Sequence, residues 1–147
     1  MASTLSMERS DALRGVLAAA VTGDATGVGN YVTKDVIAWS PNMFVTSMKE
    51  LVDEIQDRDG ALSNIEIVID AVDVVQDKAI AEWSVAADHT GTMTIDAEGE
   101  ENVVIAPTNQ RVFLAGASFA EFEGDRICAL RTYFDDAALL EQLLLIE

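Results

Sequence analysis

Four long β-type segments, joined in pairs by tight turns, most constrain how this chain can fold. They form two predicted hairpins: Ile65 to Val75 with Ala79 to His89, and Arg111 to Glu123 with Arg126 to Phe134. Gln76-Asp77 and Gly124-Asp125 supply the turns, which are too short for anything but antiparallel neighbours. The first of these segments is rich in valine and isoleucine, which strands prefer. Two successive hairpins indicate a meandering antiparallel sheet.

Helical patterns precede this β-rich half. From Ser6 to Thr22, apolar residues recur at three- and four-residue steps, and Gly23 can end the helix in a left-handed conformation. A short second helix is expected at Ala25 to Val32. Asp35 to Ser40 then reads as a strand, which Pro41 stops.

Two further helices have capping signals. Ser47 and Glu50 form a capping box that opens a helix from Met48 to Arg58. Asp135 or Asp136 caps a last helix rich in leucine. The segment from Thr90 to Gln110 is irregular, and it predicts an extra hairpin or a flap with an acidic tip at 98–101. Helices grouped before a meandering sheet indicate the α+β class.

Length and charge exclude several classes of protein. With 147 residues we expect one domain, 1–147. The net charge of −17 disfavours nucleic acid and anionic membranes as partners. No apolar run approaches the roughly 20 residues that cross a bilayer. The start lacks a secretory signal and Cys128 is the only cysteine, so we expect a cytoplasmic protein without disulfides. We expect no metal site and no cofactor, since one histidine and one cysteine cannot make a His/Cys zinc site.

Several stretches, in order, resemble the SnoaL-like branch of the nuclear transport factor 2-like superfamily. They are Ala18 to Asp24, Tyr31 to Ser40, Trp83 to Gly91 with His89-Thr90-Gly91, Ala106 to Arg111 with Pro107-Thr108-Asn109, and Phe119 to Phe134. The resemblance spans nearly the whole chain. It implies a cone-shaped fold, in which a strongly bent antiparallel sheet, N-terminal helices and a C-terminal helix surround one apolar pocket. It also implies a homodimer, with the outer face of the sheet as the contact.

The acids that serve the family's known reactions are missing here. Ser40 stands before Pro41, where ketosteroid isomerase relatives carry a carboxylate base. Thr132 and Phe113 stand where epoxide hydrolase relatives carry aspartates, and the acid of SnoaL-type cyclases also aligns at or near Thr132. A ring closure that depends on positioning and desolvation stays open, because orientation alone can lower a barrier substantially.

His89 and Asp135 are the candidate catalytic residues. Trp83, Val85, Ala87 and His89 share the more apolar face of their strand, so we place them inward, with His89 at the rim of the pocket. An imidazole can serve as acid or base near neutral pH. The alternative is that His89 holds the segment from Thr90 to Gln110 in place. For Asp135 the alternative is a helix N-cap.

Five residues are expected to bind substrate. They are Trp39, Trp83, Phe113, Leu130 and Thr132. The aromatic ones could form a wall or simply pack the core. Cys128, Leu130 and Thr132 share one face of the last strand, and by the family pattern that face lines the pocket, although Thr132 could equally be a satisfied core hydroxyl. Cys128 is expected to be a small buried residue and not a nucleophile.

These residues lead to three functional hypotheses. The first is an enzyme that cyclises or isomerises a hydrophobic, polyketide- or terpenoid-like molecule. The second is a non-catalytic domain that binds a small molecule or dimerises. The third is an epoxide hydrolase with altered catalytic residues.

Overall fold

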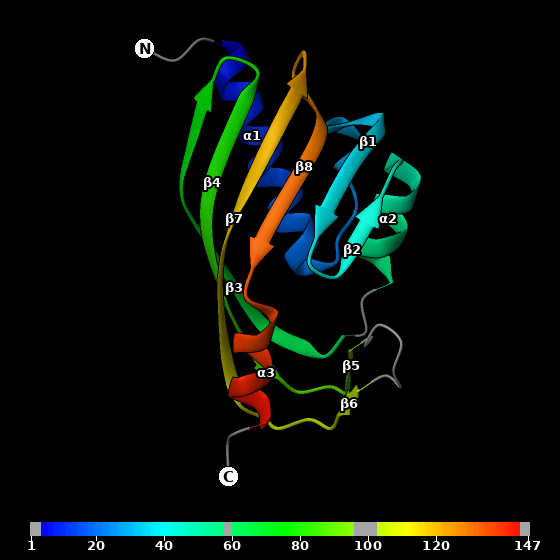
Figure 1. The fold of residues 1–147 in the computed structure, drawn as a ribbon, viewed down its shortest axis with the longest axis vertical. Helices are drawn as coiled ribbons and strands as arrows, with labels where there is room; N and C mark the ends of the chain where they lie inside the picture. Colours follow the sequence, from blue (N-terminus) through cyan, green and yellow to red (C-terminus); the bar gives the residue numbers. More distant parts are fainter. Residues whose placement is uncertain (1–3, 58–59, 96–102, 145–147) are drawn as a thin grey trace.

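The computed structural model describes residues 4–57, 60–95 and 103–144 (Figure 1). Its helices are α1 (Thr4–Thr22), the 3₁₀ turn η1 (Val28–Asn30), α2 (Met48–Gln56) and α3 (Asp136–Leu144). Its strands are β1 (Val32–Ser40), β2 (Met43–Val45), β3 (Leu62–Val75), β4 (Lys78–His89), β5 (Met93–Ile95), β6 (Val103–Ile105), β7 (Arg111–Glu123) and β8 (Arg126–Phe134). The α+β class is confirmed.

The main sheet is strongly curved and has the strand order β2-β1-β8-β7-β4-β3. The two predicted hairpins are present as β3–β4 and β7–β8, and β4 pairs with β7. The prediction of a wholly antiparallel sheet is wrong at one place, because β1 runs parallel to β8. That pairing joins strands that are far apart in the sequence, so no local turn could indicate its direction.

Tight turns close both hairpins as the sequence predicts. Gln76 adopts a φ of 56° between β3 and β4, and Gly124 adopts a φ of 65° between β7 and β8. Glycine takes this left-handed conformation without the steric cost that a Cβ brings. The strands leave these turns in register, with Val75 opposite Lys78 and Glu123 opposite Arg126.

Helix α1 covers one face of the sheet, which we call the inner face; in Figure 1 it lies behind β4, β7 and β8. Leu13 and Val16 of α1 are almost wholly buried against this face. The prediction of a helix at Ala25 to Val32 is wrong, except for the single 3₁₀ turn η1. Gly27 has a φ of 93°, which an α-helix cannot accommodate, and β1 already begins at Val32.

The irregular segment after β4 contains the predicted extra hairpin, formed by β5 and β6. Its acidic tip at 98–101 lies outside the described residues. Met93 and Ile105 of this hairpin pack with Ala61, Val112 and Leu143 in a small apolar cluster. A larger apolar cluster lies between α1, α2 and the inner face. The side chains that position the candidate site belong to this inner face.

Candidate functional site

Three hydroxyl groups lie side by side on the inner face, and we call Ser40, Thr132 and Ser118 the hydroxyl row. Trp39 pairs with Arg131, which brings Ser40 of β1 next to Thr132 of β8. Ser118 of β7 is the direct partner of Thr132. All three point inward, because the residues two positions before or after them in each strand are buried; these are Ala38, Leu130 and Ala120.

A hydrogen-bond chain connects two members of the row to an indole. Trp83 Nε1 donates to Ser118 Oγ over 3.1 Å, and the hydroxyls of Ser118 and Thr132 are 2.8 Å apart. The chain therefore crosses β4, β7 and β8. At the other end of the row, Ser40 donates to Asn42 Oδ1 over 2.9 Å.

Trp83 can reach Ser118 because β7, the strand that carries Ser118, has a glycine opposite Trp83. Trp83 is opposite Gly116 in the β4–β7 pair, and a Cβ at Gly116 would lie 2.5 Å from the indole Cζ2. The ring also meets Phe134 edge-on, with 6.2 Å between centroids. The indole thus contributes an apolar surface beside the row as well as a donor, as tryptophan often does when buried.

The hydroxyl row brings together two of the three positions at which the resemblance implies an acid in catalytic relatives. Ser40 and Thr132 are neighbours on adjacent strands, whereas the third position, Phe113, lies on the outer face. None of the three side chains in the row is ionisable at neutral pH. The row can donate and accept hydrogen bonds, but it offers no carboxylate base.

His89 is on the inner face, as predicted, but it is not at a rim. The side chain is wholly buried, with 0% exposed. The Thr108 backbone N–H donates to Nδ1 over 3.2 Å, and Thr108 Oγ1 is 3.0 Å from the same atom. His89 therefore holds the segment that leads into β7, which is the structural alternative that the sequence left open.

The contact with Thr108 also fixes the tautomer of His89. A backbone N–H can only donate, so Nδ1 accepts and the neutral ring carries its hydrogen on Nε2. Among the described residues, Nε2 has no hydrogen-bond partner. Ser118 is level with Ala81 of β4, whereas His89 ends that strand, so roughly 26 Å of extended strand separates the two levels. His89 and the hydroxyl row consequently contact different regions of the inner face.

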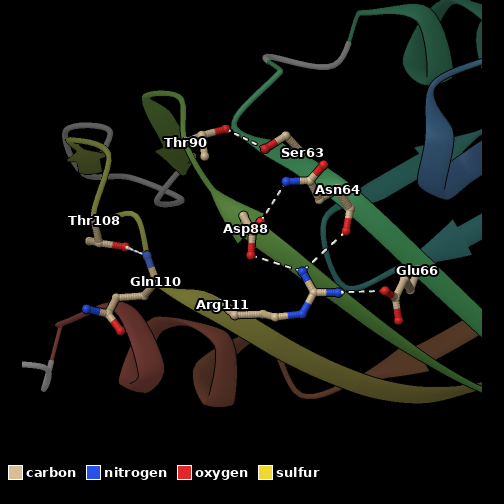
Figure 2. Close-up of polar contacts among 8 residues, drawn as sticks. All are labelled: Ser63, Asn64, Glu66, Asp88, Thr90, Thr108, Gln110 and Arg111. Carbon is tan, nitrogen blue, oxygen red and sulfur yellow. Dashed lines mark hydrogen bonds and ion pairs between the residues drawn. The ribbon is translucent and has the colours of Figure 1, made fainter.

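Charged groups gather on the opposite face of the same strand end (Figure 2). Asp88 accepts from Asn64 Nδ2 over 2.8 Å and from Arg111 over 2.9 Å. Arg111 also lies 3.4 Å from Glu66 and bonds the Asn64 carbonyl. The bonds from Asn64 and then Arg111 hold the pKa of Asp88 below its usual value. This network connects β3, β4 and β7 at the strand ends that adjoin the segment held by His89.

Trp39 and Phe113 do not share a wall with Trp83, which corrects the sequence prediction. Both lie on the outer face and are 39% and 56% exposed. Trp39 packs on Tyr133 there, with ring centroids 5.1 Å apart. The side chain of Gln142 in α3 accepts a hydrogen bond from the Phe113 N–H and donates one to the Phe113 carbonyl. Strand alternation explains the outcome, because Ala38 and Val112 occupy the inward positions.

The other predicted binding residues do lie inward, and Asp135 does not. Trp83 and Leu130 are buried, and Thr132 is half-buried on the same face. Asp135 is exposed, and its Oδ1 accepts the Ala138 N–H over 3.2 Å. This is the geometry of a helix N-cap, the alternative that the sequence allowed.

Cys128 lies at a β-bulge and not in the inward row with Leu130. The register between β7 and β8 shifts after Glu121, so that Ile127 takes the inward position. The Cys128 thiol instead donates to the Glu121 carbonyl over 3.5 Å. Burial, followed by the nearby Glu123, raises the pKa of this thiol above its ordinary value. A thiol held protonated in this way is a poor nucleophile.

Two residues of the candidate site, Ser118 and Gly116, are not among those that the sequence predicts. A signal for Ser118 was available, because it shares strand parity with Val112, Ala120 and Phe122 and is the one hydroxyl among them. Its partner could not be read from the sequence, since the bond depends on the β7–β8 register. Among the described residues, no group of three or more His, Cys, Asp or Glu side chains could hold a metal ion. In that same part of the chain, no helix is long and apolar enough to span a membrane.

Comparisons with known proteins give the fold and the family. A protein proposed to be a SnoaL-like polyketide cyclase from Jannaschia sp. CCS1 is 13% identical, with a TM-score of 0.73 over 100% of this chain and 99% of that one. AclR from Streptomyces galilaeus, proposed to be a hydroxylase, is 19% identical, with a TM-score of 0.71 over 97% and 99%. An epoxide hydrolase of the LEH-like type from M. tuberculosis is 17% identical, with a TM-score of 0.66 over 95% and 91%.

At these identities the structural likeness shows the fold alone, an α+β fold of the nuclear transport factor 2-like type. A search of curated proteins found no match. The family model for SnoaL-like polyketide cyclases matches residues 10–143, and the chain therefore belongs to the SnoaL-like polyketide cyclase family.

Proposed function

We propose that this protein is an enzyme that cyclises or isomerises a hydrophobic, polyketide- or terpenoid-like molecule on its inner face. The substrate would bind beside the hydroxyl row, in an apolar pocket that lacks the acids of related enzymes. The observation that carries the proposal is the adjacency of Ser40 and Thr132 on β1 and β8. Two independent replacements of an acid by a hydroxyl thus meet at one place.

The surroundings of the row support an apolar substrate. Ala38, Leu130 and Ala120 flank it, and the Trp83 and Phe134 rings extend the apolar surface. Such a surface binds by burial of apolar area, while a few placed polar groups orient the ligand. Membership of a family described as SnoaL-like polyketide cyclases also supports a cyclisation reaction.

The chemistry available to this site is positioning and polarisation. A hydroxyl donor aimed at a ligand oxygen stabilises the negative charge that develops there during enolisation or ring closure. Holding two reacting carbons together supplies a further, entropic contribution. Neither effect requires a carboxylate, so the composition of the row is compatible with catalysis.

The experiment that tests the proposal is turnover by purified protein. Hydrophobic substrates with several carbonyl groups are incubated with the protein, and ring closure or isomerisation is followed by mass spectrometry and NMR. We expect Thr132→Val to lower kcat/KM by about 10-fold or more, in the range of a lost transition-state hydrogen bond. Ser84→Ala, on the outer side of β4, is the matched control and should retain activity. Turnover unchanged in Thr132→Val would refute the proposed site.

A second candidate function is ligand binding without catalysis. The absence of a carboxylate from the row favours it, because related reactions use an acid at these positions. In that case ligands would bind beside Thr132 and be recovered unchanged. Turnover of any substrate by purified protein, lost in Thr132→Val, decides against this candidate.

We also propose that the protein forms a homodimer through its outer face. Aromatic side chains are exposed there on four strands; they are Trp39, Phe44, Phe119 and Tyr133. Phe119, Arg131 and Tyr133 line a shallow depression, and Arg131 pairs with Glu121 over 2.9 Å. A patch with both an arginine and a glutamate is self-complementary across a twofold axis. Light scattering should give a dimer mass that Phe119→Asp reduces to a monomer mass, and a monomeric wild-type protein would refute this contact.

The setting that we propose for this activity is the cytoplasm. Cys128 is the only cysteine, and a chain without disulfides is suited to a reducing compartment. Fractionation of cells that express the protein tests this placement.

A further inference from the structure

We infer that the Thr132 hydroxyl is a one-way hydrogen-bond donor for an uncharged carbonyl oxygen of the ligand. The inference rests on the proposed function, which places a ligand beside the hydroxyl row. It adds that the protein donates and the ligand accepts this hydrogen bond. The chemical class of the ligand group that binds there follows from this direction.

The first step is the direction of the bond between Ser118 and Thr132. Ser118 Oγ accepts the indole N–H of Trp83, which can only donate. Ser118 is 0% exposed, and Thr132 is the other hydrogen-bond partner of its hydroxyl among the described residues. If Thr132 donated to Ser118, the Ser118 hydrogen would be buried without an acceptor, which is costly. Ser118 therefore donates to Thr132.

The second step concerns the hydrogen of Thr132. Its oxygen accepts from Ser118, so its own hydrogen is free to donate elsewhere. Within residues 4–57, 60–95 and 103–144, no side chain or carbonyl accepts it, and Ser40 already donates to Asn42. Thr132 is half-buried, so a ligand or water can reach it. Three donors in series point the same way, and such chains polarise one another and strengthen the last donor.

The third step concerns charge. A donor selects an acceptor, and carbonyl oxygens and carboxylates both qualify. No lysine or arginine belongs to the row, and the neighbouring Arg131 pairs with Glu121 on the outer face. A carboxylate buried against the apolar surface of Trp83 and Leu130 would lack a counter-charge, which is unfavourable. An uncharged carbonyl meets both conditions.

The test uses three small probes of similar shape. Acetophenone carries an uncharged carbonyl, ethylbenzene has no hydrogen-bond acceptor, and benzoate carries a charged carboxylate. Calorimetry should show that Thr132→Val weakens acetophenone about 3- to 10-fold, the range for one neutral hydrogen bond, and leaves ethylbenzene within about 2-fold. Benzoate should bind the wild-type protein at least about 10-fold more weakly than acetophenone. The infrared carbonyl band of bound acetophenone should shift to higher wavenumber in Thr132→Val.

Companion variants separate the contact from misfolding. Thr132→Ser keeps the hydroxyl and should restore acetophenone affinity, and Ser84→Ala should have no effect. Ser118→Ala removes the relay and should move the carbonyl band part of the way. The inference is overturned if acetophenone does not bind, or if Thr132→Val leaves the affinity and the carbonyl band of acetophenone unchanged. It is also overturned if benzoate binds the wild-type protein as tightly as acetophenone does. Because these readouts need no turnover, they can fail while cyclisation is observed, and they can succeed in a protein that catalyses nothing.

Discussion

Gly116 lies directly beneath the indole of Trp83, and a Cβ there would approach the ring to 2.5 Å. The Tyr133 carbonyl, at the same distance, closes the other side. The absence of a side chain at Gly116 thus determines where the indole lies and whether its N–H reaches Ser118. The hydrogen-bond chain of the site depends on this glycine.

Gly116→Ala should displace the indole and break its bond to Ser118. We expect a loss of about 1–3 kcal/mol in unfolding free energy, as for overpacked cores, with a change in tryptophan fluorescence. Urea denaturation and emission spectra provide the measurement. Ala115→Val, which adds carbon on the exposed outer face of the same strand, is the control. An unchanged spectrum in Gly116→Ala would show that the ring lies elsewhere.

Replacement of His89 should loosen the segment that leads into β7. His89→Ala leaves the Thr108 N–H without its acceptor and opens a cavity, so we expect about 2–4 kcal/mol of destabilisation. His89→Asn, whose amide oxygen can accept in place of Nδ1, should lose less stability than His89→Ala. Hydrogen exchange at the Thr108 amide is the specific readout and should accelerate in His89→Ala. Equal exchange in both variants and in the wild-type protein would contradict this role.

Acid should weaken the network around Asp88. The folded pKa of Asp88 is below its ordinary value because Asn64 and Arg111 donate to the carboxylate. A depressed folded pKa stabilises the protein above the unfolded pKa, about 3.9, and this contribution is lost as the pH falls through the folded value. Denaturation from pH 7 to 3 should show that the stability gap between wild-type and Asp88→Asn protein narrows below about pH 4. Asp73→Asn, on the exposed face of β3, is the control. A gap that is constant down to pH 3 would contradict the assignment.

Cys128 should react slowly with thiol reagents. Burial and the carboxylates of Glu123, Glu121 and Asp35 raise the pKa of the thiol, so less thiolate is present at pH 7 to 8 than in free cysteine. A colorimetric disulfide reagent should label the folded protein more slowly than the urea-unfolded chain at the same pH. Labelling at the rate of free cysteine would show that the thiol is not protected.

Strand parity made part of the site predictable from the sequence. Alternation placed Trp83, Val85, Ala87 and His89 together on the buried face, and the structure confirms it. Alternation also accounts for Trp39 and Phe113, which point outward because Ala38 and Val112 take the inward positions beside them. Parity predicts Leu130 and Thr132 correctly but not Cys128, because the bulge there gives the inward position to Ile127.

Contacts between distant strands were beyond the sequence. The parallel pairing of β1 with β8 places Ser40 beside Thr132, and the β7–β8 register gives Ser118 its partner. Neither follows from local propensity, since both depend on how the sheet curves and closes on α1. The resemblance indicated which acids were missing, but only the strand order shows that the replacements are neighbours.

The most direct test of the proposed site is a crystal structure of the protein with a bound substrate, product or acetophenone. The account predicts a ligand on the inner face, with an uncharged oxygen about 2.6–3.2 Å from Thr132 Oγ1 and the ligand's apolar part against Trp83. A ligand bound only on the outer face, or one on the inner face with no oxygen within hydrogen-bond distance of Thr132, would contradict it.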